Sequence, residues 1–117
     1  MTPRQLLHAA HQLVEQPTIG TDGFWARTSA ALARQALEQA VQVKLSRYAG
    51  SLEDVPWTAQ MLAVHGVCSD HATAARAYFV WSALSQALHH NGYELPPSAE
   101  ALRGWIVVVD EVITALE

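Results

Sequence analysis

One uninterrupted helical segment, FWARTSAALARQALEQAVQVKLSRY (residues 24–48), sets the architecture of this chain. Neither proline nor glycine breaks it before Gly50, and its apolar positions cover roughly half of a helical wheel. They lie opposite a continuous polar side that carries Arg27, Arg34 and Glu38. So wide an apolar surface contacts two neighbouring helices, which predicts a bundle. The positions expected to be buried are Trp25, Leu32, Ala33, Ala36, Leu37, Ala40, Val41 and Val43.

Shorter helices are expected before and after this segment, and caps and helix breakers mark their ends. The segment 72–88 is apolar almost all round, so it is expected to be the central helix. The sequence shows no strand alternation and predicts an all-α fold, an antiparallel bundle of four to five helices in one domain spanning residues 1–117. The first helix is expected to begin at Thr2 with Pro3 and to end at Pro17, and a short helix is expected from near Pro56 to Gly66. The helix that contains residues 72–88 is expected to begin at Ser69 or Asp70 and to end at His89 or His90, and a last helix is expected to begin at Ser98.

Composition excludes several classes of protein. Half of the residues are hydrophobic and 15% are charged, which is outside the disordered range and leaves apolar surface for a partner. The net charge is −4 without a basic stripe, so tight non-specific binding to nucleic acid is disfavoured. Cys68 is the single cysteine, and the longest apolar run, residues 105–109, is too short to span a membrane. We expect a soluble cytoplasmic protein.

The side chains most capable of chemistry gather where the helix at 72–88 ends. His89 and His90 occupy the negative end of the helix dipole, which favours imidazolium, and Tyr93 and Glu94 follow closely. One interpretation is an acid/base or phosphate-binding corner; the other is a pair of capping rings beside a tyrosine that ties down the loop. Adjacent helical positions point about a hundred degrees apart, so both imidazoles share one site only if the helix ends between them. The other candidate binding residues at this corner are Gln86 and Asn91.

Arg34 and Glu38 lie one turn apart near the edge of the apolar face of the long helix. As an exposed pair they would stabilise the helix by only a few tenths of a kcal/mol. Alternatively, one of the two turns inward and holds a histidine from the segment 72–88. In that case both belong to the binding site.

Phe79 stands on the polar side of its helix, together with Ala83 and in line with Arg76. Two interpretations remain open. Another helix of the same chain covers Phe79, or a two-fold interface buries it and brings two copies of the histidine corner together. The second interpretation predicts a homodimer, with Arg76, Phe79 and Ala83 at the interface.

A metal site is the weakest interpretation of the remaining histidines. His8 and His11 share a face with Glu15, and His65 or His71 would have to join them from another helix. Neither Glu-x-x-His nor His-Glu-x-x-His occurs in the sequence. We therefore expect neither a metal nor a cofactor, and keep a metal-binding bundle only as an alternative.

Two short motifs, RQALEQA (residues 34–40) and LSQALHHNGYEL (residues 84–95), are arranged as in a known family. From Arg34 onward the chain resembles the HEPN superfamily of small helical bundles, in particular bacterial members with an Arg-x-x-Leu-Glu helix and a later helix that ends near histidine. The resemblance covers about two-thirds of the chain. It implies a HEPN-like fold, a homodimer, and a protein or RNA/nucleotide partner in a bacterial defence or toxin–antitoxin system.

Active members of that family use an Arg-x(4–6)-His motif in metal-independent RNA cleavage, where the histidine handles a proton and the arginine steadies the phosphate. Carried over to this chain, the resemblance makes His89 or His90 the catalytic histidine. Residues 82–88 contain no basic residue, so the arginine of the motif is missing unless Arg34 replaces it. We therefore expect a binding or regulatory protein with an altered site, with an endoribonuclease as the alternative.

Overall fold

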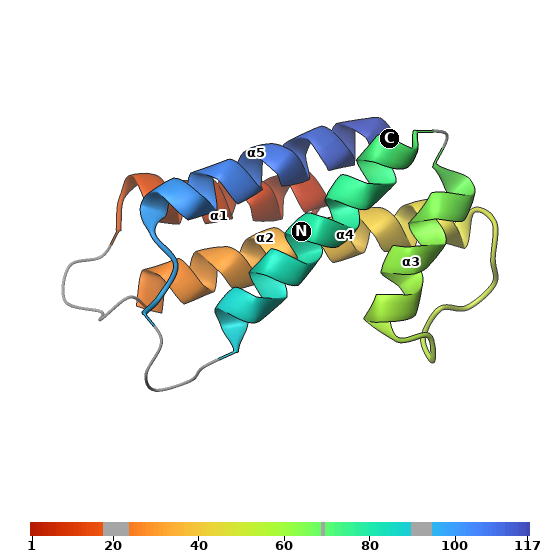
Figure 1. The fold of residues 1–117 in the computed structure, drawn as a ribbon, viewed down its shortest axis with the longest axis horizontal. Coiled ribbons are helices and arrows are strands. Elements are labelled where there is room, and N and C mark those ends of the chain that lie inside the picture. Colours follow the sequence, from red (N-terminus) through yellow and green to blue (C-terminus); the bar gives the residue numbers. More distant parts are fainter. Residues whose placement is uncertain (18–23, 69, 90–94) are drawn as a thin grey trace.

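Five α-helices form the chain (Figure 1), and the computed structural model describes residues 1–17, 24–68, 70–89 and 95–117. Within these ranges there is no β-strand, which confirms the predicted all-α class. The helices enclose one core of buried aliphatic and alanine side chains. Their bounds are α1 Pro3–Glu15, α2 Phe24–Ser46, α3 Trp57–Val67, α4 His71–Leu88 and α5 Ala99–Leu116.

The long helix α2 is the centre of the fold, because it packs against each of the other four helices. The prediction that the segment 72–88 would be central is wrong: α4 packs on α2, α3 and α5 but makes no packing contact with α1. The reason is the size of the side chains. Completely buried alanines, among them Ala26, Ala30, Ala33 and Ala36, line α2 and let neighbouring helices approach it from two sides.

The helices are arranged in an elongated body of 45 × 25 × 25 Å. In Figure 1, α1, α2 and α5 follow the long axis, α4 crosses them obliquely, and α3 lies at one end. The packing of α1 on α2 is close enough for the buried Ser29 hydroxyl to donate a hydrogen bond to the Ala10 carbonyl, at 2.9 Å. This bond satisfies a polar group inside the core.

Three helices begin at the caps expected from the sequence. Thr2 and Gln5 form a reciprocal capping box on α1, Asp70 accepts a hydrogen bond from the backbone N–H of Ala72, and Ser98 accepts one from Ala101. The hydroxyl of Thr73 also donates to Asp70, and these bonds lower the pKa of Asp70 below its ordinary value.

The helix ends agree less closely with the expectation. The second helix ends at Ser46 and not at Tyr48, and Gly66 lies inside the last turn of α3. Helix α4 ends at Leu88, with His89 as its C-terminal cap. No helix in the described part of the chain is long and apolar enough to cross a membrane.

Two side chains of α2 differ in exposure from the positions that the helical wheel gives them. Val43 was expected in the core but is 54% exposed, whereas Glu38 was placed on the polar face and is only 8% exposed. Position along the helix explains both. Glu38 lies where α4 crosses α2, while Val43 lies near the end of α2, where the described helices beside it also begin or end.

Candidate functional site

A pocket of about 260 Å³ lies where α2 begins, α4 ends and the chain enters α5. We call it the corner pocket. His89 reaches it because α4 stops at Leu88, and the backbone N–H of His89 donates to the Gln86 carbonyl at 3.1 Å. Its principal lining residues are Arg27, Gln86, His89, Leu95, Pro97 and Trp105.

Arg27 is the cation of the corner pocket, and the sequence analysis did not select it. It is half-buried, and its Nε is buried without a hydrogen-bond partner among the residues the structure describes. An unpaired buried N–H is uncommon in folded proteins because its desolvation is not offset. The signal was present in the sequence, since Arg27 lies two turns before Arg34 on the same polar side of α2, the side that meets α4.

The walls of the corner pocket set its chemistry. Arg27, Gln86 and His89 supply N–H groups, and none of the described lining residues is acidic. Leu95, Pro97 and the half-buried Trp105 give one side an apolar surface. An arginine fork pairs well with phosphate or carboxylate, and an apolar wall beside it suits a ligand that also carries a flat or aliphatic body.

Arg34 and Glu38 form a second polar cluster further along α2. Glu38 Oε2 accepts a hydrogen bond from Trp81 Nε1 at 3.1 Å and lies 3.8 Å from Arg34 Nε. Arg34 Nη1 in turn lies 3.5 Å from the hydroxyl oxygen of Ser85. Thus Glu38 does turn inward, as one of the two interpretations held, but its partner on α4 is a tryptophan and not a histidine.

The two clusters do not merge into one site. Arg34 and Glu38 line a different pocket, of about 450 Å³, that the side chain of Trp57 also borders. The contacts follow opposite orders on the two helices: Arg34 meets Ser85, and the later Glu38 meets the earlier Trp81. Arg27, at the start of α2, correspondingly reaches the end of α4, where His89 stands.

Two of the six residues of the predicted corner are described. His89 and Gln86 are exposed at the rim of the corner pocket. The remaining members of the predicted corner lie outside the described residues; they are His90, Asn91, Tyr93 and Glu94.

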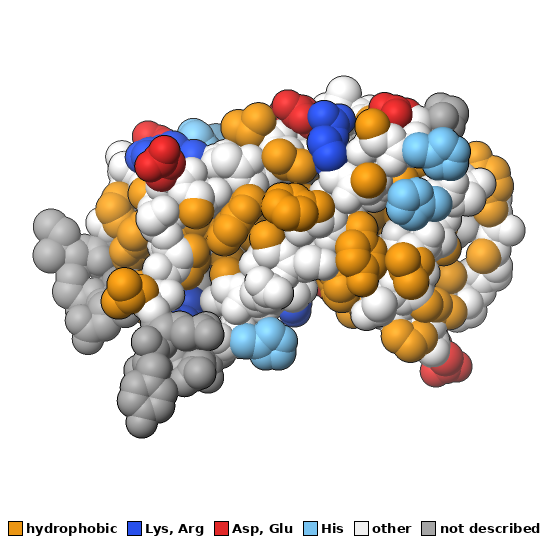
Figure 2. Space-filling view, viewed as in Figure 1, with side chains coloured by type: hydrophobic (Ala, Val, Ile, Leu, Met, Phe, Trp, Pro, Cys, Tyr) orange, Lys and Arg blue, Asp and Glu red, His pale blue; other side chains and the backbone are white. Residues whose placement is uncertain are grey.

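Phe79 is 67% exposed, so none of the described helices covers it. Arg76, also exposed, pairs with Glu111 of α5 at 3.4 Å. Ala83 is half-buried and borders the corner pocket, which places the predicted interface next to that pocket. Figure 2 shows hydrophobic side chains gathered over α4 and α3 on this face of the molecule.

The histidines proposed for a metal site are not brought together. His11 Nε2 lies 4.0 Å from Glu15, whose carboxylate also pairs with Arg103 at 3.1 Å. His65 and His71 stack on each other instead, with ring centroids 6.2 Å apart, at the junction of α3 and α4. Within the described ranges, no group of three histidine, cysteine or acidic side chains is placed to hold a metal ion.

Comparison of the chain with protein-family models, with curated proteins and with solved structures finds no match. Function is therefore inferred from the residues of the corner pocket. Its useful features are a half-buried arginine whose Nε has no described hydrogen-bond partner, an exposed imidazole at a helix end, and an apolar wall.

Proposed function

We propose that this chain is a small helical binding protein whose corner pocket takes a phosphate-bearing ligand without altering it. The observation that carries the proposal is the unpaired buried Nε of Arg27, in the same pocket as the exposed His89. An anion in the corner pocket would pair with the guanidinium of Arg27, and the formation of such a charge-assisted bond favours binding. His89 and the amide of Gln86 add donors, while Trp105 offers a surface for the rest of the ligand.

The family and the biological setting are part of the same proposal. The resemblance of residues 34–40 and 84–95 to the HEPN superfamily supports an antiparallel HEPN-like bundle, and the opposite order of the α2 and α4 contacts is consistent with it. On that basis the protein acts as a regulatory component of a bacterial defence or toxin–antitoxin system in the cytoplasm. Two copies associate through Phe79, with Arg76 and Ala83 beside it.

Binding of adenosine 5′-monophosphate and of inorganic phosphate tests the proposal. We expect saturable binding in calorimetry and a shift of the Trp105 indole N–H resonance. Arg27→Gln and His89→Gln should each weaken binding by about tenfold, the loss of one charge-assisted bond. Arg34→Gln is the matched control, because Arg34 lies on the same helix in a different pocket. Equal loss in the control, or no response of Trp105, would contradict the proposal.

A second candidate is a metal-independent endoribonuclease, and one specific observation favours it. The segment 82–88 lacks the arginine of the family motif, but Arg27 lines the same pocket as His89. In this role His89 would handle the proton of a ribose hydroxyl or leaving group, and Arg27 would steady the phosphate.

Cleavage of RNA in EDTA separates the two candidates. An enzyme of this kind would cleave in EDTA, and its activity would fall by at least a hundredfold in His89→Ala and in Arg27→Ala but not in Arg34→Ala. Intact RNA, together with binding that depends on Arg27, would leave the binding protein as the function. Cleavage that persists in the double variant His89→Ala, His90→Ala would identify a contaminating nuclease.

A further inference from the structure

A second pocket, of about 360 Å³, lies at the opposite end of the molecule from the corner pocket. We call it the end pocket. It is enclosed by the start of α1 and the ends of α2 and α5. Val43 in this pocket and Arg27 in the corner pocket are both on α2, about 24 Å apart along its axis at the ordinary helical rise. A ligand in one pocket therefore does not touch the other.

The floor of the end pocket is aliphatic. Ala40, Ile113 and Leu116 are buried core side chains that border it. Val43 lies beside them, and its 54% exposure is unusual for a residue on the apolar side of the central helix. The end pocket thus presents continuous apolar surface that the described residues leave open to solvent.

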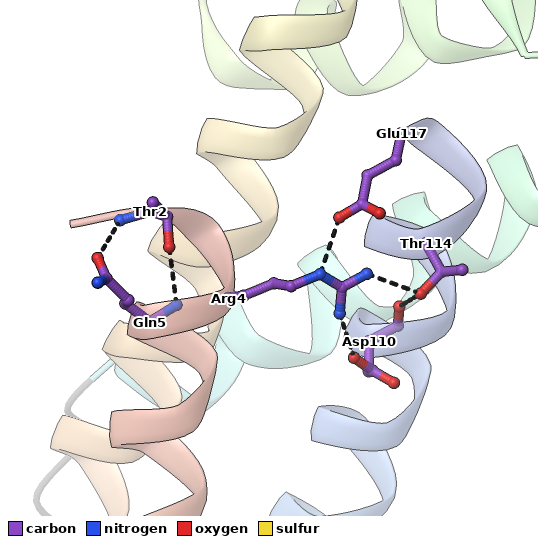
Figure 3. A network of polar contacts seen from close by, with 6 residues as sticks. All are labelled: Thr2, Arg4, Gln5, Asp110, Thr114 and Glu117. Atoms are coloured by element: carbon purple, nitrogen blue, oxygen red, sulfur yellow. Dashed lines mark hydrogen bonds and ion pairs between the residues drawn. The ribbon is translucent and has the colours of Figure 1, made fainter.

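Arg4 borders the end pocket and bridges α1 and α5 (Figure 3). Its guanidinium reaches from α1 to three side chains of α5: Nε donates to Glu117 at 2.8 Å, Nη1 to Asp110 at 3.0 Å and Nη2 to Thr114 at 3.0 Å. The hydrogen bond from Arg4 also lowers the pKa of Glu117. Each of the three guanidinium nitrogens of Arg4 thus donates a hydrogen bond, and its single positive charge faces two carboxylates.

Arg47 is the cation left over at this end. It stands one turn after Val43, is exposed, and makes no ion pair with any described residue. Among the described residues that border the end pocket, Glu117 is the one acid, and it is already paired with Arg4. The end pocket thus combines an apolar floor with the guanidinium of Arg47 at its rim, which pairs with no described carboxylate.

We propose that the end pocket binds an aliphatic monocarboxylate of medium chain length. The chain lies on Val43 and Leu116, and the carboxylate pairs with Arg47. The volume lies within the range of small-molecule sites, and a single carboxylate matches the single rim guanidinium that has no described ion-pair partner. A longer aliphatic chain covers more of the floor, so affinity should rise by up to about fourfold for each added methylene until the pocket is full.

Titration with hexanoate, octanoate and decanoate below their micelle concentrations tests this site, with backbone amide resonances and calorimetry as readouts. We expect saturable shifts at Val43, Arg47 and Leu116, and affinity that increases with chain length. Arg47→Gln should weaken octanoate binding by about tenfold. Octanol carries no charge, so it should bind the unchanged protein as weakly as octanoate binds Arg47→Gln. Octyltrimethylammonium carries a positive charge and should bind more weakly still.

Val43→Asp should abolish binding, and Val107→Asp is its matched control. Val107 is 56% exposed, almost the same as Val43, but lies on α5 beside a different groove. Because both valines are exposed, both variants should retain the helical circular dichroism of the parent. Equal loss in the two variants, or equal affinity for octanol and octanoate, would overturn the proposal. Self-association that Val43→Asp abolishes would also overturn it, since a second copy would then occupy the surface.

Discussion

Glu38 of α2 accepts a hydrogen bond from the indole Nε1 of Trp81 on α4, at 3.1 Å, with the carboxylate almost completely buried. The bond joins α2 and α4, and the start of α2 and the end of α4 line the corner pocket. It fixes how far α4 is displaced along α2, and therefore which residue of α2 stands opposite His89. A buried polar group of this kind specifies one arrangement of helices, because other displacements would leave it unpaired.

Replacement of Glu38 tests this role. Glu38→Ala should lower the free energy of unfolding by about 1–3 kcal/mol, because Trp81 Nε1 loses its acceptor in a half-buried position. Glu38→Gln should cost clearly less, since the amide oxygen can still accept. Urea unfolding of both, with the exposed Gln35→Ala as control, measures the difference. If the two Glu38 variants are equally unstable, the hydrogen bond does not fix the helices.

Leu84 and Phe79 are both apolar residues of α4 but have opposite surroundings. Leu84 is completely buried, so Leu84→Ala should destabilise the protein by about 2–5 kcal/mol through lost burial and a cavity. Phe79 is 67% exposed, so Phe79→Ala should change the stability of the monomer by no more than about 0.5 kcal/mol. Chemical denaturation at low protein concentration checks both values, and a large loss in Phe79→Ala would contradict the exposure.

Asp70 should make stability depend on acid pH. Hydrogen bonds from Thr73 and from the Ala72 backbone lower its pKa in the folded protein below the ordinary value of 3.8. Because the pKa is lower in the folded protein, ionised Asp70 stabilises the fold in full above the ordinary pKa of 3.8. This stabilisation is lost as the pH falls through the pKa of the folded state. The stability difference between the protein and Asp70→Ala should therefore shrink as the pH falls below 3.8. Unfolding curves between pH 2 and 6 measure it, and a constant difference would mean that ionisation of Asp70 is irrelevant.

The proposed homodimer predicts a dependence on Phe79. Sedimentation should show a species of twice the 12.8 kDa chain mass, and Phe79→Glu should convert it to the monomer because a charge would then be buried at the interface. Val107→Glu, a change at a similarly exposed apolar residue of α5, should leave the dimer intact. A monomer at every concentration, or dissociation by both variants, would refute the proposed interface.

Most of the helix starts follow from residues within one turn of them. Thr2 with Gln5, Asp70 and Ser98 each satisfy backbone N–H groups three or fewer positions away, so these signals can be read without knowledge of the fold. The buried stripe of α5 could likewise be predicted from its spacing. Part of the candidate site was accessible in the same way, since His89 at the end of α4 was expected and lines the corner pocket.

The choice of neighbours could not be read from any single helix. A helical wheel shows that α2 has an apolar half, but not that α4 crosses it at Glu38 or that Val43 stays exposed near its end. Those facts depend on side-chain volumes summed over several helices, which also made the alanine-rich α2 and not α4 the centre. The sequence by itself thus determined the helices and their caps, because those interactions are local. Only the tertiary structure decided that Arg27 and His89 line the same pocket, because that arrangement depends on how two distant helices pack.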